Sequence, residues 1–492
     1  MIKKFSVNDA NIELSCDPAG QHPLYLYCQP SSTNAYYSKN LKALLDHQDV
    51  THEPNIDGIS FLLQSGITPP PLTAYKYIYI IGSGDTCRLN SKNGYISLEF
   101  SYHFPFSQEL LPNDNSDTPD SSLLLEAIAN AVITGVKTNA PNFLFQTSGK
   151  DSNLIALALA EAGWQNKVMC LTQSFHGEKD ESALAKKIAA KMGFKHTSLP
   201  EIYSFDIAKT QRIESYFSKA PLPSLDKVTL AYAQYPGIIP ELIESNIIDG
   251  SGSDRYLFNP PNTKQTRTIT SAKRLVKLSQ FRGLVTGNSK SLRSLFSTPA
   301  ERVGLRGFSY QETKSIFPEA VDCVDYWIEQ SNSRKNWNIL DFKSDLKSRY
   351  IDNEMYLRKV RNIADVWDAN LLLPLTHPKV VELSRARPIE QIVQLNPTRN
   401  KVFVRELLKT KMELDSDSIG KYGYAYDYKR VIQENKQWFH STIMSCTLWQ
   451  KINMEHLLNR LWKSVEKESS HESRQLYRLA LISGWHNARF NA

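Results

Sequence analysis

The chain has 492 residues, of which 41% are hydrophobic and 22% charged, and a formal net charge of +7 from 58 basic and 51 acidic residues. This composition is typical of a folded globular protein with room for two or three domains, and it excludes a peptide hormone, a fibrous protein and a largely disordered chain. The sequence has no run of about 20 apolar residues, the length that a membrane-spanning helix requires. The small excess of basic residues does not by itself indicate nucleic-acid binding.

The first residues, Met1 to Asp9, include two lysines but no apolar segment after them, so we expect no secretory signal and a cytoplasmic location. Six cysteines are scattered without C-x-x-C pairs or metal-ligand spacing: Cys16, Cys28, Cys87, Cys170, Cys323 and Cys446. We therefore expect reduced, buried thiols rather than disulfides or a structural zinc site.

A stretch dense in turn formers and acidic residues, 110–122, indicates a domain boundary, which we place after residue 118. Before it, short β-rich runs such as 75–81 and 94–100 alternate with turns, so we expect a small α+β domain over residues 1–118. The second domain, over residues 119–492, has a different pattern.

In this second domain, apolar runs and helical periodicity alternate along the chain. The predicted elements are, in order, a helix over 123–137, a strand over 143–146, a helix over 153–162, a strand over 168–172, a helix following Asp180 and ending at Gly193, and strands over 195–199 and 246–249. This alternation predicts right-handed βαβ units and a parallel sheet whose ligands bind beyond the carboxyl ends of its strands. From about residue 322 onward the pattern is mostly helical.

The hexapeptide Thr147-Ser-Gly-Lys-Asp-Ser152 lies between the first of these strands and a helix. Consecutive backbone N–H groups in such a turn, together with a helix N-terminus, form an anion site suited to polyphosphate. Gly149 would let the backbone approach the phosphates, Lys150 would offer an ammonium, and Thr147, Ser148 and Ser152 would offer hydroxyls. Asp151 would repel bare phosphate, but it suits a Mg²⁺ ion bound beside it. The alternative is that Asp151 or Ser152 only caps the next helix.

A second strand-to-loop transition lies about a hundred residues further on, in Ile247-Ile-Asp-Gly-Ser-Gly-Ser-Asp-Arg255. Loops that follow parallel strands meet at one edge of the sheet, so Asp151 and Asp254 are expected to converge there. Two carboxylates at that edge are what one Mg²⁺ ion bridging the phosphates of a nucleotide would require.

Together, these two loops resemble the ATP pyrophosphatase domain of the asparagine synthetase and β-lactam synthetase family. Further segments follow in that family's order: Asp180-Glu181, 356–360, 374–382, 401–405, Lys421-Tyr-Gly423 and 474–485. The resemblance implies an α/β fold with a doubly wound, Rossmann-like parallel sheet and a helical C-terminal part, preceded by the small α+β domain. It also implies ATP and Mg²⁺ as cofactors, with the metal on Asp151 and Asp254.

The resemblance further assigns individual residues. Nucleotide contacts are expected from residues 147–152 and also from Leu171 and Gly250, and Lys421 is expected to be the catalytic lysine that stabilises charge beside the leaving phosphate. The alternative for Lys421 is an ordinary loop lysine.

Residues 1–118 resemble the second half of the family's glutamine-hydrolysing domain, through 17–25, 37–44 and 59–73. Position 2 is Ile, where that family has a nucleophilic cysteine, and an isoleucine side chain cannot act as a nucleophile. We therefore expect no glutaminase activity and a role as a scaffold remnant or docking surface. A truncated sheet would expose an edge that a partner or a second copy in a homodimer covers.

The sequence departs from the family where the substrate would bind. β-Lactam synthetases have a Tyr and Glu pair where this chain has Ser251 and Asn370, neither of which titrates near neutral pH. The segment Asn370-Leu-Leu-Leu-Pro-Leu375 has also lost both charges of the family pattern. His377 stands where the family has Asp, and we expect a structural role for it, with a general base for the amine as the alternative. The substrate pocket is therefore expected to differ from those of known relatives.

Between Asp254 and Glu301 the chain has no acidic residue and nine basic ones: Arg255, Lys264, Arg267, Lys273, Arg274, Lys277, Arg282, Lys290 and Arg293. Such a run is usually a solvated face, and the alternative is a surface for an anionic partner.

The function that these features favour is an AMP-forming, carbon-nitrogen amide ligase that adenylates a carboxylate and transfers the acyl group to an amine. Specialised-metabolite biosynthesis, including antibiotic ring closure or condensation of small molecules or peptides, is the expected setting. Two alternatives stay open: a tRNA-modifying ATP pyrophosphatase, and a nucleotide-binding pseudoenzyme or interaction protein. No membrane partner is expected.

Overall fold

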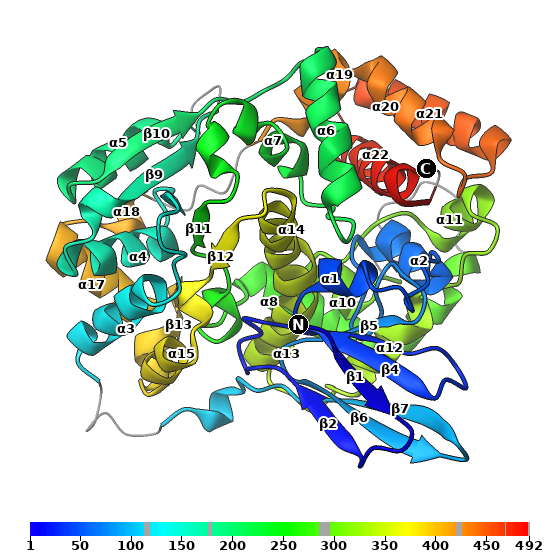
Figure 1. The fold of residues 1–492 in the computed structure, drawn as a ribbon, viewed down its shortest axis with the longest axis horizontal. Coiled ribbons are helices and arrows are strands. Elements are labelled where there is room, and N and C mark those ends of the chain that lie inside the picture. Colours follow the sequence, from blue (N-terminus) through cyan, green and yellow to red (C-terminus); the bar gives the residue numbers. More distant parts are fainter. Residues whose placement is uncertain (113–118, 176–179, 285–295, 420–425, 468, 491–492) are drawn as a thin grey trace.

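The computed structural model describes residues 1–112, 119–175, 180–284, 296–419, 426–467 and 469–490 (Figure 1). Its centre is a sheet of five parallel strands in the order β10-β9-β8-β11-β12. The strands are β8 (Asn142–Phe145), β9 (Val168–Gln173), β10 (Lys195–Leu199), β11 (Asn246–Asp249) and β12 (Asn370–Leu372). The sequence predicted the first four of these strands and the α/β class, and it missed β12.

The strand order reverses next to the first strand of the sheet. From β8 the chain moves outward through β9 to β10, and it then returns to the other side of β8 to add β11 and β12. In open parallel sheets, ligands bind beyond the carboxyl ends of the strands at such a reversal. The expected binding position is therefore between the ends of β8 and β11.

Helices cover both faces of this sheet, because alternate residues of its strands point to opposite sides. On β8, Leu144 packs with helices α3 (Ser121–Ile133), α4 (Lys150–Glu161) and α5 (Ser182–Lys191). Phe143 and Phe145 pack on the other face, which is covered by α6 (Ile207–Lys219), α7 (Thr229–Tyr232) and α14 (Arg358–Val366). The sheet is therefore doubly wound.

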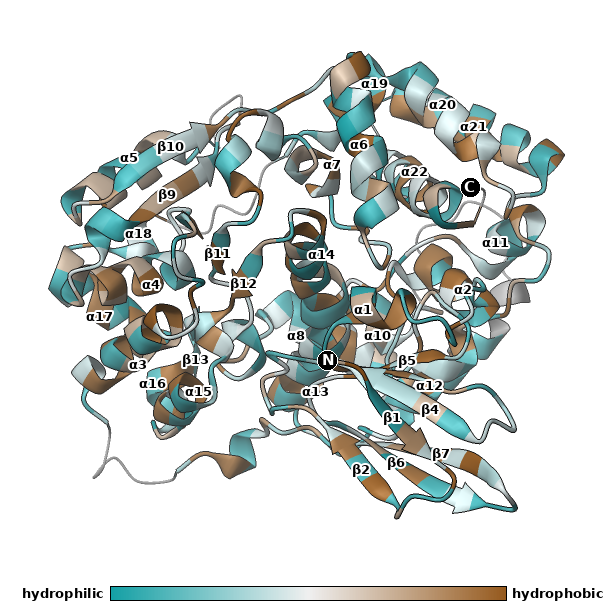
Figure 2. Ribbon diagram, viewed as in Figure 1, coloured by the Kyte–Doolittle hydropathy of each residue, from teal (hydrophilic) through white to brown (hydrophobic). Residues whose placement is uncertain are grey.

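The rest of the chain beyond β11 is mainly helical, and the sequence predicted this from about residue 322 onward. Its elements are α8 (Thr263–Arg274), α10 (Pro299–Val303), α11 (Tyr310–Ile316), α12 (Val324–Asn332), α13 (Ile339–Leu346), α15 (Pro378–Arg385), α16 (Ile389–Ile392), the hairpin β13 (Val393–Leu395) and β14 (Thr398–Asn400), α17 (Val402–Met412), α18 (Ser416–Ile419), α19 (Tyr428–Glu434), α20 (Lys436–Ser445), α21 (Lys451–Val465) and α22 (Ser470–Phe490). The outer helices α20 and α21 carry both hydrophilic and hydrophobic bands (Figure 2), as expected for helices that bury one side.

Helices α13 and α14 are joined by a π-helical segment, Lys347–Leu357. π-Helical turns are rare and occur often at functional sites. This one contacts the loop that follows β11 through two of its side chains, those of Lys347 and Asn353.

The N-terminal residues form two antiparallel sheets. One has the order β1-β4-β3-β5 and the other β2-β6-β7, with helices α1 (Leu41–Leu45) and α2 (Ile56–Ser65) beside the first. The strands are β1 (Lys3–Ser6), β2 (Ile12–Ser15), β3 (Leu24–Tyr27), β4 (Asn34–Ser38), β5 (Ile78–Ile81), β6 (Asp85–Lys92) and β7 (Tyr95–Tyr102). A small apolar cluster that includes Leu26, Cys87 and Leu89 contains residues of both sheets.

The N-terminal sheets also share the largest hydrophobic core with the C-terminal helices. Tyr25, Tyr75 and Ile80 belong to the same cluster of buried residues as Trp485 of α22. The rings of Tyr75 and Trp485 meet edge to face, with centroids 5.4 Å apart. The last described helix therefore buries part of its apolar surface against the first hundred residues.

The domain boundary placed after residue 118 stays a prediction, since residues 113–118 lie outside the described part.

Within the described residues, no helix is both long enough and apolar enough to span a membrane. None of the six cysteines forms a disulfide, and five of them are buried.

A buried histidine on α22 makes the fold sensitive to acid. His486 is 3% exposed and contacts Cys446 and the ring of Phe490. Burial lowers its pKa from 6.5 to about 4. The unfolded imidazole takes up a proton near pH 6.5 and the folded one only near pH 4, so the unfolded chain binds more protons in this interval and stability falls as the pH falls through it.

We expect His486→Phe to reduce the fall in melting temperature between pH 6.5 and 4.5, because a phenyl ring fills the same space and cannot be protonated. Thermal unfolding followed by circular dichroism at several pH values measures this. The control is His456→Phe on α21, where the histidine is exposed. An acid-induced loss of stability as large in His486→Phe as in the unsubstituted chain would contradict the assignment.

Candidate functional site

Two loops meet at the reversal point of the sheet. Asp151 lies in the first turn of α4, after β8, and Asp254 lies in the loop after β11. A Cβ atom on Gly250 would lie 3.1 Å from the backbone nitrogen of Ser152 and 3.3 Å from the Asp151 side chain, so glycine lets the loops pack closely. Gly252 has a φ of +108°, a left-handed conformation that favours glycine.

The ammonium group of Lys401 lies between the two aspartates. Its Nζ atom is 2.6 and 2.7 Å from the carboxylate oxygens of Asp151, 2.6 Å from Oδ1 of Asp254 and 2.8 Å from the hydroxyl of Ser253. The hydroxyl of Ser253 in turn donates to Asp151. The two carboxylates are thus brought together around one cation, as the sequence predicted for their positions, but that cation is a lysine.

Lys401 is held there at some cost in conformational energy. Its side chain is only 2% exposed, whereas those of Asp151 and Asp254 are 33% and 25% exposed. The backbone of Lys401 has a φ of 55°, a left-handed conformation that costs a residue with a Cβ about 1–2 kcal/mol. Strained backbone of this kind concentrates at functional sites, where the surrounding structure enforces it.

Asp254 contacts a second lysine, from the π-helical segment. Lys347 donates to Asp254 at 3.1 Å and to the buried Asp352 at 3.0 Å. The result is a row of alternating charges, Asp151, Lys401, Asp254, Lys347 and Asp352. Three carboxylates and two ammonium groups leave this row one charge negative when all are ionised.

The lysines keep their protons because of their partners. Burial alone would lower the pKa of Lys401, but the Asp151 and Asp254 carboxylates outweigh it and raise that pKa above 10.5. Burial alone would also lower the pKa of Lys347, but the Asp352 and Asp254 carboxylates outweigh it and raise that pKa. Burial raises the pKa of Asp352, although the Lys347 ammonium opposes the shift. Stability from a raised lysine pKa is fully present below the unfolded value of 10.5, so both pairs contribute fully at neutral pH.

The residue after Asp254 connects this loop to the N-terminal sheets. The guanidinium of Arg255 is 1% exposed and donates to the carbonyl of Ala19 and the side chain of Asn353. Burial lowers the pKa of Arg255 to about 10. The turn at Asp17 to Gly20 therefore supports the loop that carries Asp254.

The loop over residues 147–149 directs its amides inward. The amide of Thr147 donates to Ser152 Oγ, and that of Gly149 donates to Thr147 Oγ1. The amide and hydroxyl of Ser148 both donate to Glu181, whose pKa burial raises. The sequence predicted that consecutive amides here face a phosphate, but in the structure they bond to side chains of the protein. Contacts of this segment with phosphate stay a prediction.

Other details of the loop differ from expectation. Ser148 does not have a positive φ, so its backbone conformation suits a residue with a Cβ atom. Gly149 is the residue before α4 and has no side chain to cap that helix, so neither Asp151 nor Ser152 is its cap. Lys150 is half-buried in the first turn.

The contact of Leu171 with a nucleotide stays a prediction. Leu171 is fully buried within β9, its side chain belongs to the main core, and its carbonyl accepts a hydrogen bond from the amide of Gln146. The apolar side chain of Leu171 packs in the main core because, at its position in β9, the side chain points to that face of the sheet. Lys421, the expected catalytic lysine, lies outside the described residues.

Ser251 and Asn370 are not brought together as a pair. Asn370 begins β12 opposite Asn246, so it lies at the amino ends of the strands, whereas Ser251 follows the carboxyl end of β11. The Asn370 amide donates to Asn246 Oδ1 and to the carbonyl of Gly135, both at 2.8 Å, and Asn246 donates to Asn142. These three asparagines join neighbouring strands and are structural.

The structure also shows the surroundings of His377 and of part of the basic run. His377 precedes α15, is half-buried, and its Nδ1 atom has no hydrogen-bond partner within the described residues. The basic run is not one surface: Arg255 is buried, and Lys273 donates to the carbonyl of Trp337 and lies over the ring of Phe342. Lys290 and Arg293 lie outside the described residues.

The residues around Asp151 fit a magnesium site in which the protein supplies only a few of the ligands. Across the described ranges, no group of three or more His, Cys, Asp or Glu side chains has metal-site geometry. Mg²⁺ commonly uses only one or two protein carboxylates and takes its other ligands from phosphate and water. Two carboxylates directed at one cation, with a serine hydroxyl beside them, match that donor set.

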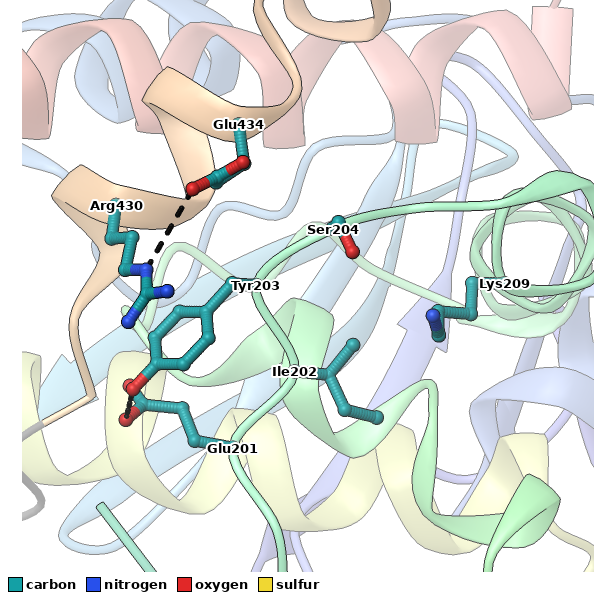
Figure 3. A pocket seen from close by; sticks show the side chains of 7 residues that line it. All are labelled: Glu201, Ile202, Tyr203, Ser204, Lys209, Arg430 and Glu434. Carbon is teal, nitrogen blue, oxygen red and sulfur yellow. Dashed lines mark hydrogen bonds and ion pairs between the residues drawn. The ribbon is translucent and has the colours of Figure 1, made fainter. Parts of the chain in front are cut away.

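A separate hollow of about 310 Å³ lies beside α19 (Figure 3). Tyr203 crosses it, donating to Glu201 and lying under the guanidinium of Arg430. Arg430 also pairs with Glu434, and Lys209 pairs with Asp206. The charges around this hollow are therefore matched by the protein itself.

No protein-family model matches this chain, and no curated protein matches it with significance.

Sequence reasoning identified the two aspartates but gave no role to Lys401 or Lys347. Lys401 lies 250 positions from Asp151, and the segment 401–405 stands out only because it follows the order of the family that the chain resembles. Lys347 lies in a helical region with no motif to mark it.

We expect Lys401→Met to lower the free energy of unfolding at pH 7 by about 2–3 kcal/mol, because the two aspartates lose their shared cation and repel each other. This is below the 3–5 kcal/mol typical of a fully buried pair, since both carboxylates are partly exposed. Urea denaturation measures the change, with Lys379→Met on the exposed face of α15 as the matched control.

Magnesium at 10 mM should stabilise Lys401→Met more than the unsubstituted chain, because the metal then has no competing ammonium. No stabilisation of Lys401→Met by magnesium would show that these carboxylates do not form a cation site.

Proposed function

We propose that the protein is an ATP-dependent amide ligase that forms AMP and diphosphate. The observation that carries the proposal is the convergence of Asp151 and Asp254 on one cation at the reversal point of a doubly wound sheet. This is where such folds bind nucleotides, and it is the donor set that a magnesium ion on a nucleotide uses.

Asp151 and Asp254 are the residues that would hold Mg²⁺, which supplies positive charge next to the departing diphosphate. Lys401 supplies a further positive charge from the protein. Its stem is buried and its ammonium is already oriented toward the same point, so it loses little freedom when it meets a phosphate oxygen. A preorganised group of this kind is typically worth about 3–4 kcal/mol of transition-state stabilisation.

In the first step, a carboxylate oxygen of the substrate attacks the α-phosphorus of ATP, and the bond from that phosphorus to the bridging oxygen breaks to release diphosphate. In the second step, an amine attacks the acyl carbon, loses a proton and displaces AMP. Lys421 is proposed, by resemblance, to stabilise the tetrahedral intermediate that forms when the amine attacks the acyl carbon. Holding amine and acyl adenylate together supplies up to about 7–11 kcal/mol through proximity. Ring closure or condensation in specialised metabolism is the proposed setting.

The second candidate is a nucleotide-binding pseudoenzyme. The specific observation in its favour is that an ammonium already fills the point between the aspartates, and that Asp254 contacts a second lysine as well.

We expect the purified chain with ATP, Mg²⁺ and a panel of amino acids and short peptides to release AMP and diphosphate in equal amounts. Chromatography of nucleotides together with a coupled diphosphate assay measures both products. Asp254→Asn should reduce the rate by at least about a hundredfold, because removing one preorganised charge costs this much. The control is Asp206→Asn, since asparagine also caps α6 and Asp206 is exposed.

ADP and phosphate as products would contradict the ligase mechanism. Nucleotide binding without any turnover, unchanged by Asp254→Asn, would support the pseudoenzyme instead.

A further inference from the structure

A second cavity, of about 290 Å³, lies where the N-terminal sheets meet the parallel sheet. It is lined by residues 21–41 of the N-terminal region, by the helix α14, by residues 369–373 around the strand β12, and by Lys137 and Pro221. The cavity is not part of the site around Asp151. Asn370 lines it at the amino end of β12, whereas Asp151 follows the carboxyl end of β8.

The charges around this cavity are strongly unbalanced. Four cationic side chains line it, Lys39, Lys137, Arg358 and Arg361, with His22, whose pKa burial lowers, and the single acid Asp365. Burial raises the pKa of Asp365 to about 6, and the nearby arginines and Lys42 act against that shift. At neutral pH the cavity therefore has a net positive charge.

The two arginines of α14 differ in their partners. Arg358 donates to the carboxylate of Glu354 and to the hydroxyl of Tyr25, so its charge is balanced within the protein. The hydrogen bond that the structure gives Arg361 is to the carbonyl of Gly20, at 2.6 Å, which is a neutral acceptor. Burial lowers the pKa of Arg361, and the charge of Arg358 acts in the same direction. A guanidinium in this position gains from an anion beside it.

The remaining wall of the cavity is formed by apolar side chains and by side-chain amides. Pro23, Leu41, Pro221 and Leu371 supply apolar surface, and Asn40 and Asn362 supply amide groups. A cavity of this size and lining accepts a small organic molecule rather than a bare ion alone.

We propose that this cavity binds a small organic anion, through a carboxylate or phosphate group held by Arg361 and Lys39. The planar guanidinium offers two parallel donors that match either group. The apolar wall takes the body of the ligand. This site is additional to the proposed nucleotide site and does not depend on the ligase activity.

The test follows His22, which lines the cavity. Burial lowers its pKa, and the Lys39 charge adds to this, so an anion bound beside it should raise that pKa. The full chain, labelled with ¹³C at the histidine ring and assigned with His22→Gln, is titrated separately with succinate and with inorganic phosphate. The anion that moves the His22 signal at the lower concentration identifies the preferred group.

Two substitutions separate binding in the cavity from general charge effects. Lys39→Glu should weaken the binding by about tenfold or more, because it replaces an attractive charge with a repulsive one. Lys3→Glu makes the same change of charge on an exposed lysine of β1 outside the cavity, and it should leave the titration unchanged. Arg361→Gln should abolish binding. Since Arg361 is partly buried, the exposed Lys39 keeps the test valid if that variant folds poorly.

A saturable shift of His22 that is weakened by Lys39→Glu supports the site. Its absence with both anions at 20 mM and low salt, or an equal shift in Lys39→Glu, would overturn it. The titration is repeated in Asp254→Asn. An unchanged His22 shift there places the anion outside the nucleotide site, and this result stands whether or not the ligase assay succeeds.

Discussion

The arrangement of this protein depends on one electrostatic constraint: two aspartates that lie close together in a partly buried place need a cation between them. Lys401 supplies it, at the cost of burying an ammonium and of a left-handed backbone. Like charges at this distance in a medium of low polarity would otherwise repel strongly. The loops after β8 and β11, the start of α17 and the π-helical segment are all positioned by this charge row.

The N-terminal residues contact the elements around this charge row. Arg255 and Arg361 donate to the neighbouring carbonyls of Ala19 and Gly20, so one turn of the N-terminal region contacts both the loop that carries Asp254 and the helix α14. The edge-to-face contact of Tyr75 with Trp485 adds an apolar connection to the last helix. These contacts connect the N-terminal region to both the parallel sheet and the C-terminal helices.

The sequence predicted the elements whose signal is local. Short segments of four or five residues between helical patterns predicted β8, β9, β10 and β11, and the loops after β8 and β11 were correctly placed at one edge of the sheet. The three-residue β12 was missed because so short a segment becomes a strand only by pairing with β11. The positions of Leu171 in the core and of Asn370 at the amino ends of the strands were not readable from a motif, because packing and strand register decide them.

The sequence by itself therefore determined the fold class, the two acidic loops and their common side of the sheet, because strand and helix periodicity and turn chemistry are encoded over a few neighbouring residues. Only the tertiary structure decided that Lys401 and Lys347 neutralise those loops, and that Arg358 is paired while Arg361 faces a cavity. These contacts join residues as far as 341 positions apart, and which charges meet depends on how the sheet, the helices and the N-terminal turn pack together.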